Sequence, residues 1–242
     1  MIVAISRPSR RLARRALVLA VAALVAPSLV RGQPVPPGAS ARLASLVQRA
    51  MAVRVPTESA AEYAQAAAAY RGLLAELQQV PRDSLDRDDQ VDHDLLRAHL
   101  RTRQWEIEDV RLHTVRPLAY LALTATDRLF LRPGAIADAG IREALEELRR
   151  LPRVLANGKA NLAIPARVWA ELAIRQARYA RLLLDDYVPT LRPTDPQLGR
   201  DLVATLPAAR AAVDDDRAWL ERDLLPRSTR SPAWRPSEIE FY

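Results

Sequence analysis

The apolar positions between residues 83 and 110 predict a helix around which the rest of the chain packs. Its apolar or small side chains recur at intervals of four, three, four and three, at Val91, Leu95, Ala98, Thr102 and Trp105. This spacing places them on one stripe of a helix. Leu96, Leu100 and Ile107 lie beside the stripe and widen it, so we expect neighbouring helices to cover a broad apolar face. Asp83 or Ser84 is expected to cap the helix.

The same periodicity predicts further helices, separated by proline and glycine. The expected ranges are 41–54, 59–80, 117–130, 136–156 and 165–187, followed by 198–206 and 207–225, which form one or two further helices. Thr57 or Ser59 is expected to cap the second of these. Pro152 should kink or split the helix over 136–156, and Asn157-Gly158 should end it. The predicted fold class is all-α, an irregular bundle of about seven to eight helices.

Buried faces can be predicted for these helices in the same way. The helix over 136–156 should bury Ile141, Leu145, Leu148 and Leu151, which recur at helical spacing. The helix over 165–187 should bury a stripe of larger side chains, at Trp169, Leu172, Gln176, Tyr179 and Leu183. Such faces need partners, so each helix is expected to pack against at least one other.

Composition supports this fold class. Half of the 242 residues are apolar, alanine, leucine and arginine dominate, and there are only seven glycines. These residues favour helices, whereas the aromatic and β-branched residues typical of sheets are sparse. The chain has no cysteine, which excludes disulfides and thiolate metal sites.

The first 32 residues have the pattern of a secretory signal peptide. A basic segment from Arg7 to Arg15 precedes eleven apolar residues, and Val30-Arg31-Gly32 offers a cleavage site before Gln33. Eleven apolar residues are too few for a spanning helix, which needs about twenty. The alternative is a buried or interfacial N-terminal helix. We therefore expect an exported protein, periplasmic or extracellular, with no transmembrane helix after cleavage; secretory and twin-arginine export both stay open.

Three regions follow from this assignment. Residues 1–32 form the signal peptide, 33–40 a flexible linker rich in proline, and 41–242 the helical domain. The formal charge of +7 depends on the leader, because six of its residues are arginines and none is acidic. Without them the chain holds 30 basic and 29 acidic residues, so nucleic-acid binding is not expected.

Catalytic motifs are absent. None of the three histidines, His93, His99 and His113, is followed by glutamate, so there is no His-Glu-x-x-His zinc motif. Neither a Gly-x-Ser-x-Gly elbow nor a phosphate-binding loop occurs. Trp105, Trp169 and Trp219 fall on apolar helix stripes and Trp234 does not; core packing is preferred to a sugar or peptide platform.

An acidic cluster near residue 90 is the one candidate for a metal site. It consists of Asp89, Asp92, His93 and Asp94. Carboxylates at a helix start are expected from the helix dipole alone, so a solvated cap is the preferred interpretation. Val91 stands where a calcium loop would require glycine, which excludes that motif.

Several segments share their order and spacing with one bacterial family. They are Ser84-Leu85, Gln90-Val91-Asp92-His93-Asp94-Leu95-Leu96, Arg116-Pro117-Leu118-Ala119-Tyr120, Leu148-Arg149-Arg150-Leu151-Pro152, Ala160-Asn161-Leu162, Ala173-Ile174 and Trp234-Arg235-Pro236. Through these segments the chain resembles the family called domain of unknown function 885. The resemblance covers most of the chain after the leader.

The resemblance implies a fold like that of helical zinc peptidases, in proteins that are secreted or lipid-anchored and more than twice this long. Their metal site lies in the C-terminal half, on a His-Glu helix followed by Pro-Gly-His-His. This chain contains neither motif, so the resemblance assigns it no catalytic, cofactor-binding or metal residue. Zinc is expected only in full-length members, and the sequence leaves open whether this chain is an enzyme.

Two hypotheses follow. In the first, the chain is the N-terminal helical portion of a secreted, zinc-peptidase-like protein, incomplete at its C-terminus and inactive alone. Its partners would be the missing C-terminal half, or a second copy bound through exposed apolar helix faces. In the second, the chain is a stand-alone exported helical binding or scaffold module without catalytic activity. The first predicts that the isolated chain binds hydrophobic dyes and melts without a sharp transition.

Overall fold

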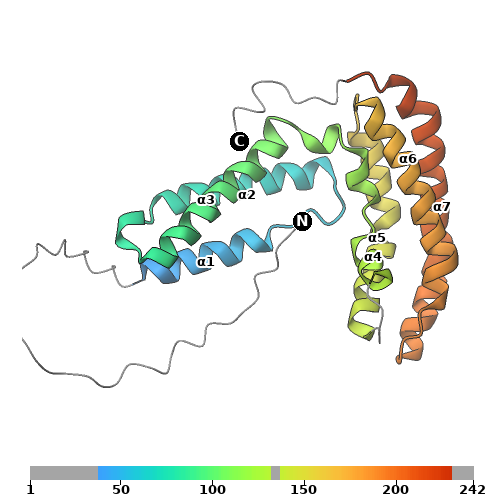
Figure 1. Ribbon diagram of the computed structural model, residues 1–242, viewed down its shortest axis with the longest axis horizontal. Helices are drawn as coiled ribbons and strands as arrows, with labels where there is room; N and C mark the ends of the chain where they lie inside the picture. The colour runs from blue at the N-terminus through green and yellow to red at the C-terminus, as the bar shows by residue number, and fades with distance from the viewer. Residues whose placement is uncertain (1–37, 132–136, 231–242) are drawn as a thin grey trace, which may run out of the picture. The chain divides into compact units, whose positions relative to one another are not determined.

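The computed structural model describes residues 38–131 and 137–230 (Figure 1). Within these ranges the chain forms seven α-helices joined by short 3₁₀ and π turns, and strand-like pairing is limited to one isolated bridge between Ala166 and Arg230. The all-α prediction is confirmed. Among the described helices, none is both long enough and apolar enough to cross a membrane.

Helices α1 (Ala39–Ala52), α2 (Ala60–Gln78) and α3 (Arg87–Glu108) pack side by side (Figure 1). They share a buried apolar cluster that includes Leu43, Leu46, Ala67, Tyr70, Leu73, Leu77, Leu96, Leu100 and Ile107. Of the two expected caps for α2, Ser59 is the one used. Its hydroxyl accepts a hydrogen bond from the Glu62 amide, and the Glu62 side chain accepts one from the Ser59 amide.

The predicted buried face of α3 is wrong at Val91 and Leu95 and right at Trp105 and at the three residues expected to widen the stripe, Leu96, Leu100 and Ile107. Val91 and Leu95 are 53% and 58% exposed, whereas Leu96 and Leu100 are buried. Helix α3 is covered by α1 and α2 on one side only, so the narrower face around Leu96 and Leu100 is sufficient. The predicted cap is also wrong: the Asp86 carboxylate accepts a hydrogen bond from the Asp89 amide at 2.9 Å, while residues 82–84 form a separate 3₁₀ turn.

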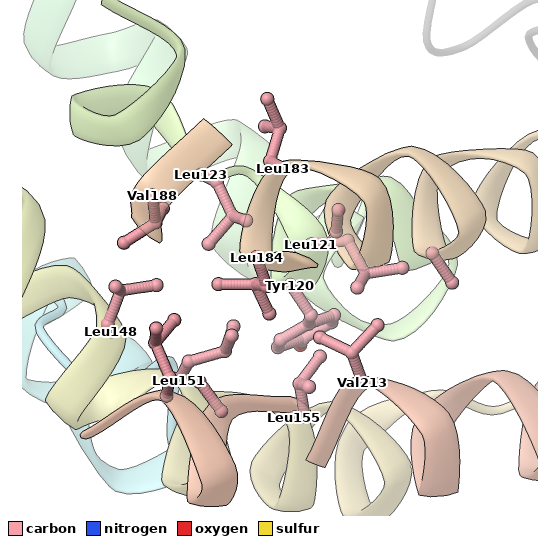
Figure 2. Close-up of a cluster of buried hydrophobic side chains, with 14 of the residues drawn as sticks. Tyr120, Leu121, Leu123, Leu148, Leu151, Leu155, Leu183, Leu184, Val188 and Val213 are labelled. Carbon is pink, nitrogen blue, oxygen red and sulfur yellow. The ribbon is translucent and has the colours of Figure 1, made fainter. Parts of the chain in front are cut away.

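The larger apolar core lies among a 3₁₀ turn, η3 (Pro117–Leu121), and helices α5 (Asp138–Asn161), α6 (Arg167–Leu182) and α7 (Pro196–Trp219). Figure 2 shows side chains of η3, α5, α7 and the π turn η4 (Leu183–Tyr187) that follows α6 in this interior, among them Tyr120, Leu148, Leu155, Leu184 and Val213. Ile141, Leu145, Leu148 and Leu151 are all buried, as the spacing predicts.

Neither internal proline splits its helix. Pro152 lies within α5, and Pro207 lies within α7, so the segment expected to form one or two helices after residue 198 contains a single α-helix. A proline inside a helix removes one hydrogen bond and costs about 3 kcal/mol. Both helices bury apolar side chains before and after the proline, such as Leu151 and Leu155 on α5, and this burial offsets the cost.

Gly158 does not end α5, which continues to Asn161. A Cβ atom at position 158 would lie 2.7 Å from Cγ of Tyr120, closer than real Cβ atoms approach other atoms. Glycine is therefore required here by the close packing of α5 against η3.

The helix predicted over 117–130 is divided into η3 and α4 (Thr124–Phe130). The division is stabilised by Glu147 of α5, whose carboxylate oxygens accept hydrogen bonds from the Ala125 and Thr126 amides at 2.9 and 3.0 Å. These amides start α4 and would otherwise lack partners. This cap comes from a residue more than twenty positions away, so local periodicity does not indicate it.

The buried face of α6 also differs from the prediction. Its fully buried line consists of small side chains, at Ala170, Ala173, Ala177 and Ala180. Of the predicted stripe, Leu183 is buried in the π turn that extends α6, while Trp169 and Tyr179 are only partly buried. Alanine allows close helix approach, so the closest packing follows the small residues and the larger ones lie at its margins.

Candidate functional site

A charged cavity of about 310 Å³ lies where the segment after α1 meets α2, α3 and the turns η2 (Leu112–Thr114) and η3. We call it the Glu58–Arg116 pocket, after two of its lining residues. A second cavity of about 460 Å³ shares Glu58 and three other lining residues with it and extends to α5. The two cavities are therefore neighbours on either side of Glu58 and Ala119.

Glu58 has an unusual backbone conformation at this site. Its φ angle is 58°, in the left-handed region that residues other than glycine rarely adopt. Two amide side chains of α5 hold the strained segment: the Asn157 amide donates to the Thr57 carbonyl and the Asn161 amide to the Glu58 carbonyl, both at 2.7 Å. Backbone strain of this kind is concentrated at functional sites, which makes the pocket the leading candidate.

The Glu58 carboxyl group is poised to change its charge near neutral pH. Burial, and then the nearby Glu62 carboxylate, raise its pKa to about 7 against the opposing effect of the Arg103 guanidinium. The carboxyl group accepts a hydrogen bond from the Tyr63 hydroxyl. A group with this pKa exists in both protonation states at neutral pH, and shifts of this kind are concentrated at functional sites.

Two stacked aromatic side chains line the pocket beside Glu58. The rings of Tyr63 and His113 stack with centroids 4.4 Å apart and an interplanar angle of 22°. Burial, and then the charge of Arg111, lower the pKa of His113, so its imidazole is neutral at pH 7. Its Nδ1 atom is buried and has no hydrogen-bond partner among the described residues. The Tyr120 hydroxyl fixes the segment by donating to the His113 carbonyl at 2.5 Å.

Arginines supply most of the charge in the pocket. Arg103 donates to the Glu106 carboxylate at 2.6 Å and hydrogen-bonds the Tyr70 side chain, so its charge is compensated. Arg54 donates only to backbone carbonyls, of Met51 and Val53. Arg116 is exposed, and its guanidinium has no hydrogen-bond or ion-pair partner in the described part of the chain. The pocket therefore carries an excess of positive charge when Glu58 is protonated.

The pocket has no constellation typical of nucleophilic or metal catalysis. It contains no serine or cysteine paired with a base. Across residues 38–131 and 137–230, no three His, Asp or Glu side chains come together as a group that could hold a metal ion. Charged groups, aromatic rings and a protonatable carboxyl group in one cavity can bind a polar organic ligand.

The acidic cluster expected near residue 90 does not join the pocket. Asp94 forms ion pairs with Arg82 at 2.8 Å and Arg97 at 3.4 Å, and His93 is buried. His99 contacts Tyr70 edge-on, with ring centroids 6.2 Å apart. Trp105 is buried and Trp219 packs against the larger core, consistent with core packing, while Trp234 lies outside the described residues.

Four lining residues of the pocket stand out in the sequence, Ile107, His113, Arg116 and Ala119, and the sequence indicates a site role for none of them. The remaining lining residues come from segments far apart in the chain, and no motif links them. The strained φ of Glu58 and the asparagine contacts to its segment are tertiary features. The Arg116-Pro117 junction within the family-like segment 116–120 is the one local signal that falls at this site.

The described residues thus form an all-α protein with a charged cavity and with no cluster of three metal-ligating side chains. Residues 44–242 match the family model described as "Bacterial protein of unknown function (DUF885)". The chain belongs to this family, which confirms the resemblance at that level. No curated protein matches the sequence.

One solved structure is similar in fold. It is described as "The structure of a putative lipoprotein of unknown function from Shewanella oneidensis", and it matches with a TM-score of 0.61 at 18% identity. The match covers 76% of this chain and 35% of that one. The chain thus spans about a third of the length of this structural neighbour, and at this identity the likeness shows the fold alone.

Proposed function

We propose that this chain is the N-terminal helical portion of a longer, exported protein of the DUF885 family, in which it forms one wall of a ligand-binding cleft. The observation that carries the proposal is the Glu58–Arg116 pocket, a strained and charged cavity without a catalytic constellation among the described residues. Binding without chemistry is what such a set of side chains supports.

Two further observations support the place of this wall in a longer protein. The structural neighbour is much longer than this chain, and only about a third of it is matched. The family resemblance implies a zinc site on a His-Glu helix in the C-terminal half, and this sequence has no His-Glu pair. The basic and apolar leader, together with a neighbour described as a lipoprotein, supports export.

The chain by itself is expected to bind no stoichiometric zinc and to hydrolyse no peptides. A catalytic zinc site needs three protein ligands and an open position, and the described residues group no such set. Elemental analysis after dialysis, and an assay with a mixed peptide library, check this expectation. One tightly held zinc per chain, or zinc-dependent hydrolysis, would contradict the proposal that the chemistry lies outside this chain.

A stand-alone exported binding or scaffold module is the second candidate. It is favoured by the contacts with which this chain itself holds the pocket in shape, from the Asn157 and Asn161 amides of α5 to the Thr57 and Glu58 carbonyls. The two candidates differ in what covers the exposed apolar side of α3 around Val91 and Leu95. A longer protein, or a second copy, would cover it; a stand-alone monomer would leave it in water, melt cooperatively and bind no hydrophobic dye.

A further inference from the structure

We propose that the Glu58–Arg116 pocket recognises the carboxylate group of a small organic ligand, of the size of an N-acylated amino acid. The inference rests on the proposed function, because it takes this pocket as the ligand site, and it adds the chemical class of the ligand. It is carried by the charge balance of the pocket, the unpartnered Arg116 and the mixed aromatic and apolar lining.

The charge balance favours a monoanion. The pocket is lined by three guanidinium groups, of Arg54, Arg103 and Arg116, and by two carboxyl groups, of Glu58 and Glu106. Glu106 compensates Arg103 at 2.6 Å, and Glu58 is protonated in part of the population. The remaining excess is one to two positive charges. One carboxylate is balanced by this excess in either protonation state of Glu58, whereas a phosphate dianion needs two positive charges and is balanced only when Glu58 is protonated.

Arg116 is the group best placed to provide this recognition. Its guanidinium is exposed and has no partner among the residues described, so binding a carboxylate breaks no existing ion pair. Arginine matches carboxylates with two parallel N–H donors, which gives direction as well as charge. A protonated Glu58 carboxyl group adds an O–H donor near the same anion.

The lining of the pocket accounts for an organic group on the ligand. Tyr63 and His113 present a stacked wall, and Val53, Ile107 and Leu112 add apolar surface. The His113 imidazole, which burial keeps neutral, brings no opposing charge. A cavity of about 310 Å³ is at the lower end of the range for small-ligand sites and admits one amino-acid-sized group.

Binding should strengthen as Glu58 takes up its proton. The charged or titratable groups that line the pocket with Glu58 or lie next to it are Arg54, Glu62, Tyr63, Arg103, Glu106, His113, Arg116 and Tyr120. Burial lowers the pKa of His113, which places its transition below that of Glu58. A carboxylate ligand should therefore bind more tightly at pH 6 than at pH 8.

The test is isothermal titration calorimetry of the full chain with N-acetylphenylalanine, N-acetylphenylalanine amide and phenyl phosphate. We expect the acid to bind, and the amide and the phosphate to bind at least about tenfold more weakly. Arg116→Ala should weaken binding of the acid by about tenfold or more, whereas Arg153→Ala, at an exposed arginine of α5 outside the pocket, should not change it. Glu58→Gln should abolish the difference between pH 6 and pH 8.

Equal binding of the acid and its amide would overturn the carboxylate assignment, and tighter binding of phenyl phosphate would replace it with a phosphate site. Absence of binding by all three probes, with native circular dichroism, would overturn the inference. That result would leave the proposed function standing if the chain also lacked zinc and hydrolytic activity. Zinc-dependent hydrolysis by the chain would instead contradict the proposed function, whichever probe binds.

Discussion

Replacing Gly158 with alanine is expected to destabilise the protein, although alanine is the better helix former. The added Cβ would lie 2.7 Å from Cγ of Tyr120 and 3.1 Å from its Cβ. The Tyr120 ring cannot easily retreat, because it is 3% exposed and its hydroxyl is hydrogen-bonded to the His113 carbonyl and the Asn161 amide. Overpacking of this kind costs about 1–3 kcal/mol, and we expect the upper end.

Gly72 provides a matched control for this prediction. It also lies inside a helix, α2, but a Cβ atom there would meet nothing within 4 Å. Gly72→Ala should therefore stabilise the protein by about 0.5–1 kcal/mol, through helix propensity alone. Urea unfolding followed by circular dichroism measures both variants. If Gly158→Ala were as stable as wild type, the close contact between α5 and η3 would be wrong.

Stability should fall as the pH rises from about 4 to 7, and Asp216 should be a main cause. Asp216 of α7 is only 5% exposed, and burial raises its pKa to about 7, an effect that Lys159 opposes and Asp215 reinforces. In the unfolded chain an aspartate loses its proton near pH 3.9. Between these values the folded state binds more protons, so the free energy of unfolding decreases with rising pH.

Asp216→Asn removes this dependence because an amide does not titrate. At pH 7.5 the variant should be more stable than wild type, by an amount on the order of 3 kcal/mol, while the two should be similar near pH 4. Asp215→Asn is the control, since Asp215 is exposed and pairs with Lys159 at the surface; its effect should stay below about 1 kcal/mol. Urea titrations at several pH values measure both. A pH profile unchanged by Asp216→Asn would contradict the assignment.

The raised pKa of Glu58, like that of Asp216, lowers the free energy of unfolding as the pH rises. In the Asp216→Asn variant the free energy of unfolding should therefore still decrease somewhat as the pH rises. Because Glu58 lines an open cavity, solvent screens its charge and its share should be smaller than that of Asp216. A bound carboxylate would increase this share, since it favours the protonated form of Glu58.

Helix positions were predictable because helical periodicity is local. Ile141, Leu145, Leu148 and Leu151 recur at the spacing of one helix face, and each is buried. Where the prediction failed, the deciding partner was distant in sequence. The amides at the start of α4 are capped by Glu147 of α5, and no property of residues 117–130 indicates that cap.

The buried face of a helix was harder to predict than the presence of the helix. On α3 the stripe from Val91 to Trp105 and the stripe through Leu96 and Leu100 are both apolar, and only the packing of α1 and α2 decides which is buried. On α6 the small alanines are buried because close approach of helices favours them, while periodicity drew attention to the larger Trp169 and Tyr179.

The candidate site could not be predicted from the sequence. Glu58 belongs to the segment between α1 and α2, and its left-handed backbone is held by two asparagines of α5, about one hundred residues later in the chain. Its pKa is set by burial, which the neighbouring sequence does not reveal. In the sequence, each of Arg103, Arg116 and Tyr63 looks like an ordinary surface or helix residue. Only the fold brings them together around one cavity.

The most direct test of the central proposal is the size and location of the native polypeptide. An antibody raised against residues 41–230 should be used on fractionated cells of the source bacterium. We expect an exported species well above the 26.9 kDa of this chain, because the chain is proposed as one part of a longer DUF885 protein. A species of 26.9 kDa or less would contradict that proposal and favour the stand-alone module, and a cytoplasmic species of any size would contradict export.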